Sequence, residues 1–178
     1  SDAVASVVLS DSYFPGLRNL EPNMGQADVW TDIRGQLKET GSDIGESVDF
    51  GRLFRIAADW SPSEQEKVAE AMGPAGARWL CQLGQLADTH AGAEMFVEAG
   101  LTAERIVAVE QPVTALYDEF SPFEATRDYL QNHLPRCRVA TVPGAKHLAP
   151  VQNPTALVKL VQQHLDWARG EETVSPRG

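Results

Sequence analysis

The chain contains 178 residues, of which 43% are hydrophobic and 22% are charged, a balance typical of globular proteins. Its formal net charge is −10 and no basic cluster is present, which argues against binding to a nucleic-acid backbone. No apolar run approaches the roughly 20 residues of a membrane span, and no signal peptide is recognisable. Because Cys81 and Cys137 are distant and form no CxxC motif, we expect reduced thiols and a cytoplasmic location.

The first predicted element is a buried strand over residues 4–9, a short apolar run rich in β-branched side chains. A polar, turn-rich loop should follow, to about residue 26. Apolar residues at helical spacing then predict helices over residues 27–39 and 46–58.

The next segment opens with Ser61-Pro62-Ser63-Glu64, a capping box with proline at the first helical position. The helix that it starts should run to about Met72. Gly73-Pro74 should then break the chain before another helix over 75–88 and a short one over 91–99.

The pattern changes after Gly100, where apolar β-type runs alternate with helical ones. In chain order we expect a short helix capped by Thr102, a strand over 112–117, a helix over 122–134, a strand over 138–142, a loop over 143–152 and a last helix that starts at Asn153-Pro154. Strand, helical segment, then alternating helices and strands indicate an α/β fold with a parallel sheet.

The loop Val142-Pro143-Gly144-Ala145-Lys146-His147-Leu148-Ala149-Pro150 follows a predicted strand, and α/β folds place ligands and reacting groups at such strand ends. With Asn153-Pro154 behind it, this loop resembles the histidine loop of the α/β-hydrolase family, P-G-A-G-H-x-x-x-x-E-x-P. Residues 112–123 resemble the family's P-V-L-x-I-Y-G-E-x-D-P-F strand and loop, and residues 3–11 resemble its D-R-V-A-x-L-V-L-x-D strand.

The resemblance implies a domain organisation. Residues 1–11 and 101–169 would form the C-terminal three parallel strands of an α/β-hydrolase sheet and their helices. Residues 12–100 would be an inserted helical cap, and residues 170–178 a disordered tail.

The resemblance also implies a catalytic pair. His147 takes the place of the family's general base, although a loop histidine without this setting is more often structural. Ser121 stands where the family has its aspartate, and serine cannot carry the negative charge that stabilises an imidazolium. Asp11 is the first choice for the acid, because some members carry it at the end of that strand. Asp118, three residues before Ser121, is the alternative.

The family's nucleophile motif, G-x-S-x-G, does not occur in the chain. In the family the serine precedes the acid and the histidine, so it would lie before residue 1. The resemblance therefore implies a second polypeptide, from cleavage or a split gene, that supplies earlier strands, the nucleophile and the oxyanion hole. Without it, the strand over 4–9 would expose an apolar edge.

Six large apolar side chains of the segment 12–100 are candidates to line a substrate pocket, with packing of the segment's own small core as the alternative. They are Trp30, Phe54, Trp60, Trp79, Met95 and Phe96. The expected activity is hydrolysis of a small apolar ester, thioester or lactone through a Ser-His-Asp triad. A C–C bond or epoxide hydrolase of the same fold, and a non-catalytic binding protein, are the alternatives.

No cofactor and no metal are expected. His147 has no further ligands at metal-binding spacing, and no phosphate-binding glycine loop is present.

Overall fold

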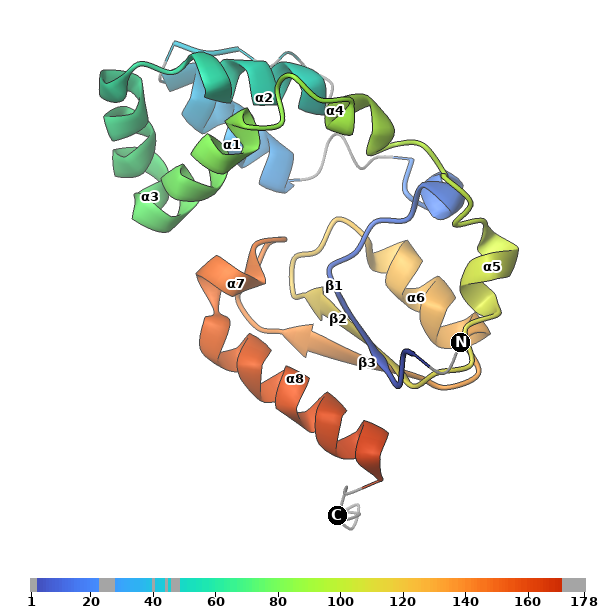
Figure 1. Cartoon of the computed structure of the whole chain (residues 1–178). Helices are drawn as coiled ribbons and strands as arrows, with labels where there is room; N and C mark the ends of the chain where they lie inside the picture. Colours follow the sequence, from blue (N-terminus) through green and yellow to red (C-terminus); the bar gives the residue numbers. More distant parts are fainter. Residues whose placement is uncertain (1–2, 23–27, 40, 44, 46–48, 171–178) are drawn as a thin grey trace. The chain divides into compact units, whose positions relative to one another are not determined.

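The computed structural model describes residues 3–22, 28–39, 41–43, 45 and 49–170 (Figure 1). The chain divides into two compact units, which we call the strand unit (residues 1–22 and 100–178) and the helical unit (residues 23–99). Within the described residues, no helix combines the length and the apolar character that crossing a lipid bilayer requires.

The strand unit is built on a parallel sheet of three strands in the order β1-β2-β3. The strands are β1 (Val7–Ser10), β2 (Val113–Asp118) and β3 (Cys137–Val142), and every residue of the central strand β2 is buried. The three predicted parallel strands are thus confirmed, although β1 begins at residue 7 instead of residue 4. Because parallel strands run in the same direction, their carboxyl ends meet at one edge of the sheet.

Helices surround this sheet, and Figure 1 shows the strands between α6 and α8. Two of the predicted caps are formed: the side chain of Thr102 accepts from the N–H of Arg105, and that of Asn153 accepts from the N–H of Ala156. A short helix, α7, lies inside the segment expected to be a loop. The helices of the strand unit are η1 (Pro15–Leu20, a 3-10 helix), α5 (Ala103–Val107), α6 (Glu124–His133), α7 (Ala149–Gln152) and α8 (Pro154–Arg169).

Residues 12–22, which the sequence assigns to the cap, lie with the strand unit. The Tyr117 hydroxyl donates to the carbonyl of Ser12 at 3.0 Å. The Glu21 carboxylate accepts from the N–H of Thr126 at 2.6 Å. These partners come from β2 and α6, so the Ser12 carbonyl and the Glu21 carboxylate are hydrogen-bonded within the strand unit.

The helical unit contains α1 (Asp28–Glu39), α2 (Phe50–Asp59), α3 (Pro62–Gly84) and α4 (Ala91–Glu94), and no strand among its described residues. The capping box is formed: the N–H of Ser61 donates to Glu64 at 2.8 Å, and the N–H of Glu64 donates to the Ser61 hydroxyl at 3.4 Å. The expected break is at Gly73, whose φ of +75° interrupts α3 before Pro74. The two predicted helices therefore form one kinked element.

An apolar cluster holds the helical unit together. It includes Trp30, Phe54 and Trp60, and an edge-to-face contact joins Trp30 to Phe50 with ring centroids 5.2 Å apart. The predicted tail lies outside the described residues, apart from Gly170, which ends α8 in a left-handed conformation.

Candidate active site

The most distinctive polar contact of the strand unit joins the loop after β3 to the residue that follows β1. The imidazole Nδ1 of His147 lies 2.6 Å from Oδ2 of Asp11. The Asp11 side chain is 3% exposed and the His147 side chain 26% exposed. This geometry favours the tautomer in which Nδ1–H donates to the carboxylate, which directs the other ring nitrogen away from Asp11.

Both residues of the pair have unusual backbone conformations. Asp11 has a φ of +44° and His147 a φ of +89°; among the described non-glycine residues, Ala99 alone shares a positive φ with them. A left-handed backbone is costly for a residue with a Cβ and persists where the surroundings enforce it. The N–H of Asp11 is held by the carbonyl of Leu116 at 2.7 Å, which extends the β1–β2 pairing by one residue.

Asp118, the last residue of β2, is hydrogen-bonded to both residues of this pair. Its Oδ2 accepts from the backbone N–H of His147 at 2.7 Å and from that of Ala149 at 3.1 Å. Its own N–H donates to Oδ1 of Asp11 at 3.2 Å. Burial, and secondly the charge of Asp11, raise the pKa of the Asp118 carboxyl above its ordinary value.

Further side chains bind the backbone of the histidine loop, and sequence reasoning did not predict this role for them. The signal available was the loop itself, because an irregular segment has backbone groups that strand or helix hydrogen bonds do not satisfy. The bonds are from the Gly144 N–H to Glu119 at 2.8 Å, from the Lys146 N–H to Gln152 at 2.7 Å, and from the Asn153 side chain to the Pro143 carbonyl at 3.0 Å.

Ser121 makes a local contact with the backbone. It is 8% exposed, and its hydroxyl accepts from the N–H of Phe123 at 3.0 Å. Phe123 meets the His147 imidazole edge-to-face, with ring centroids 5.1 Å apart. The imidazole therefore has an acidic partner at Nδ1 and an apolar ring at its side.

The side chains expected to line a substrate pocket belong to the helical unit, and packing accounts for most of them. Trp30, Phe54 and Trp60 are 3%, 2% and 6% exposed in its core. Trp79 and Phe96 pack partly buried against that core, whereas Met95 is 44% exposed. A cavity of about 300 Å³ does exist in this unit; it is lined in part by Phe54, Arg55, Leu86 and His90.

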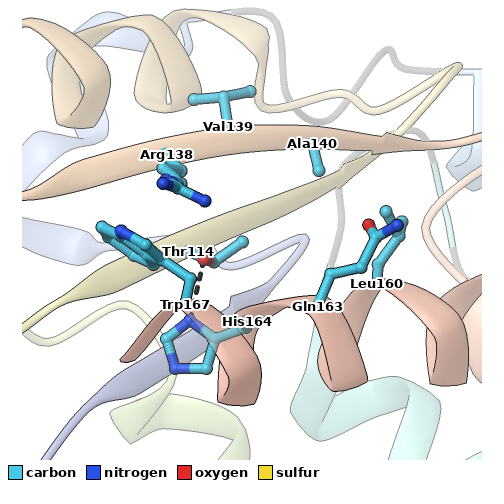
Figure 2. Close-up of a pocket in the computed structure, with 8 residues that line it drawn as sticks. All are labelled: Thr114, Arg138, Val139, Ala140, Leu160, Gln163, His164 and Trp167. Atoms are coloured by element: carbon cyan, nitrogen blue, oxygen red, sulfur yellow. Dashed lines mark hydrogen bonds between the residues drawn. The ribbon is translucent and has the colours of Figure 1, made fainter. Parts of the chain in front are cut away.

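A second cavity, of about 170 Å³, lies between the sheet and α8 (Figure 2). The His164 imidazole contacts the Thr114 hydroxyl at 2.8 Å, and the Arg138 guanidinium lies 4.2 Å from the centre of the Trp167 ring. Burial lowers the pKa of His164. Thr114 and Arg138 lie near the amino ends of their strands, whereas His147 follows a carboxyl end, so these contacts serve to pack α8 on the sheet.

The remaining histidines do not join the pair. His90 is exposed, and Nδ1 of His133 contacts the carbonyl of Tyr129 at 2.8 Å on the exposed surface of α6. In the described part of the chain, no three or more His, Cys, Asp or Glu side chains are grouped so that they could hold a metal ion.

Comparisons with protein-family models, with curated proteins and with solved structures found no match for this chain.

Proposed function

We propose that this chain carries the general base and the acid of a Ser-His-Asp hydrolase of the α/β-hydrolase fold, with His147 as base and Asp11 as acid. The observation that carries the proposal is the 2.6 Å contact between Nδ1 of His147 and the carboxylate of Asp11 at the carboxyl edge of a parallel sheet. This edge is where α/β proteins place their chemistry.

The pair suits proton transfer. His147 would take a proton from a nucleophilic hydroxyl and return it to the leaving group. The buried Asp11 carboxylate would orient the ring and stabilise the imidazolium, because charges interact more strongly away from water. The His147 side chain is 26% exposed, so part of it is accessible.

The contacts favour Asp11 over Asp118 as the acid. Asp11 directs Oδ2 at the ring nitrogen. The Oδ2 of Asp118 accepts hydrogen bonds from two backbone N–H groups, and its Oδ1 is buried with no hydrogen-bond partner among the described residues. Asp118 thus supports the loop that carries the base.

The proposal places the nucleophile outside these 178 residues, because they contain no G-x-S-x-G motif. A second polypeptide, the N-terminal half of the same hydrolase, would supply the nucleophile and the oxyanion hole. Its strands would extend the sheet beside β1, which is an edge strand in the order β1-β2-β3. The helical unit would serve as the cap.

A neutral apolar ester, thioester or lactone is the substrate class that we favour. The net charge of −10 disfavours an anionic substrate, and the helical unit is rich in apolar side chains. The two cysteines are free thiols, which fits a cytoplasmic location.

The test is purification of the native protein that contains this chain, together with any polypeptide bound to it, followed by labelling with a fluorophosphonate probe. We expect a serine outside the 178 residues to be labelled, and labelling should be lost in His147→Ala. The matched control is His133→Ala, on the exposed surface of α6, which should leave labelling intact.

Two results would contradict the proposal. A purified protein that is never labelled would indicate an aspartate nucleophile, as in epoxide hydrolases, or a non-catalytic binding protein. Labelling that is unchanged by His147→Ala would remove His147 from the chemistry.

A further inference from the structure

We infer that Asp118 is a positioning residue for the His147–Asp11 pair, which holds the histidine backbone in the conformation that brings the imidazole to Asp11. The inference rests on the proposed function only in giving that imidazole a catalytic task. The positioning itself is a property of the described residues and can be measured without a substrate.

The first step of the argument is the backbone of His147. Its φ of +89° is a conformation that a residue with a Cβ adopts only at an energetic cost. If this dihedral relaxed to an ordinary negative value, the direction of the Cα–Cβ bond would change and the ring would leave Asp11. Some interaction must therefore hold the backbone at this residue.

Asp118 supplies that interaction from a rigid place. Its Oδ2 accepts from the N–H of His147 at 2.7 Å and from the N–H of Ala149, two residues later, at 3.1 Å. Hydrogen bonds to a carboxylate are about twice as strong as neutral ones. Asp118 itself ends the buried central strand and is 1% exposed, so its carboxylate has a fixed position.

The three residues form a closed ring of hydrogen bonds. The N–H of Asp118 donates to Oδ1 of Asp11, Oδ2 of Asp11 contacts Nδ1 of His147, and the N–H of His147 returns to Oδ2 of Asp118. One residue therefore orients the acid through its backbone and the base through its side chain. A positioning role of this kind should alter the state of the imidazole and not just the stability of the fold.

The experiment is nitrogen and proton NMR of the whole chain, labelled with ¹⁵N-histidine, at a pH where the ¹⁵N shifts themselves show neutral rings. His147→Gln identifies the signals of His147 among those of the four histidines. In the wild type we expect the Nδ1–H tautomer of His147 with a downfield, slowly exchanging proton. Asp118→Ala should abolish this proton signal and shift the ring towards the Nε2–H tautomer.

The conservative variant Asp118→Asn keeps an acceptor oxygen and should retain the proton signal with faster exchange. The matched control is Glu119→Ala, which removes the acceptor of the Gly144 N–H from the same loop but leaves His147 bonded to Asp118. It should leave the His147 signals as in the wild type.

Three outcomes would overturn the inference. The first is an unchanged Nδ1–H signal in Asp118→Ala. The second is loss of the signal in Glu119→Ala as well, since any loosening of the loop would then be sufficient. The third, which decides the case if Asp118→Ala does not fold, is a wild-type exchange rate in Asp118→Asn.

Failure of the proposed function would look different. If the purified protein never reacts with a fluorophosphonate, but the Asp118 variants behave as expected, the hydrolase proposal fails and the positioning role stands. If the purified protein reacts and Asp118→Ala leaves the His147 signals unchanged, the positioning role fails alone.

Discussion

The imidazole of His147 and the carboxylate of Asp11 are 136 positions apart in the sequence, and their nearest polar atoms are 2.6 Å apart. Asp11 follows the carboxyl end of β1, and the histidine loop follows the carboxyl end of β3. They can meet because β1 and β3 belong to one parallel sheet, so that both ends lie at the same edge. Asp118, at the end of the central strand, contacts both residues through hydrogen bonds. The three side chains should consequently respond to substitution in different ways.

If the proposed hydrolase activity is present, we expect Asp11→Asn to abolish most of it while the fold persists. The amide is close in size to the carboxylate but removes the charge that stabilises an imidazolium and selects the tautomer. The loss in kcat for a p-nitrophenyl ester should be about 10³–10⁴-fold, with a small change in KM. Asp118→Asn should cost less, because it retains an acceptor for the loop; if Asp11→Asn kept full turnover while Asp118→Asn lost it, the acid would be Asp118.

The negative charge of Asp11 should contribute measurably to the raised pKa of Asp118. Burial and the nearby Asp11 carboxylate raise the pKa of Asp118, so its proton is bound more tightly in the folded than in the unfolded chain. The contribution of Asp118 to the free energy of unfolding therefore rises as the pH falls through that raised pKa. In Asp11→Asn the Asp118 carboxyl should ionise at a lower pH than in the wild type, measured by ¹³C NMR of the aspartate carboxyls.

The control for that titration is Asp128→Asn, an exposed position on α6 that is bonded to Arg127. It should leave the Asp118 titration unchanged. A midpoint for Asp118 that is the same in the wild type and in Asp11→Asn would show that the two carboxyls do not interact.

His164 should make the protein less stable in acid. Burial lowers its pKa in the folded chain, so the unfolded chain binds the proton more readily. The stability that the neutral imidazole provides is present above the ordinary histidine pKa and is lost as the pH falls towards the lower folded value. Urea unfolding across this range should show a steeper loss for the wild type than for His164→Gln, whereas His90→Gln, at an exposed position, should parallel the wild type.

The approach of α2 to α4 should make Gly92 intolerant of a methyl group. A Cβ at Gly92 would lie 2.6 Å from the backbone N and Cα of Gly51, and backbone atoms cannot move aside cheaply. We expect Gly92→Ala to lower the free energy of unfolding by roughly 1–3 kcal/mol. Gly35→Ala is the matched control, because Gly35 lies inside α1 with open space at the Cβ position. This substitution should raise the free energy of unfolding by roughly 0.5–1 kcal/mol. Equal effects in urea unfolding would contradict the close contact.

Local chemistry determined much of the secondary structure in advance. The capping box at Ser61, the cap at Asn153 and the interruption at Gly73 were readable because each depends on residues within a few positions of one another. The parallel strands were readable from short β-branched runs that alternate with helical ones. The start of β1 and the helix α7 were missed, because strand pairing and loop packing decide them.

The sequence by itself singled out His147 and left two aspartates open as its partner. It favoured Asp11 and kept Asp118 as the alternative, since both follow or end a strand and the contact depends on which carboxylate the sheet directs at the ring. Only the tertiary structure decided that contact, through the pairing of Ser10 with Leu116 and of Asp118 with Val142. The same pairing left Asp118 facing the backbone of the histidine loop, a relationship between distant segments that no local pattern encodes.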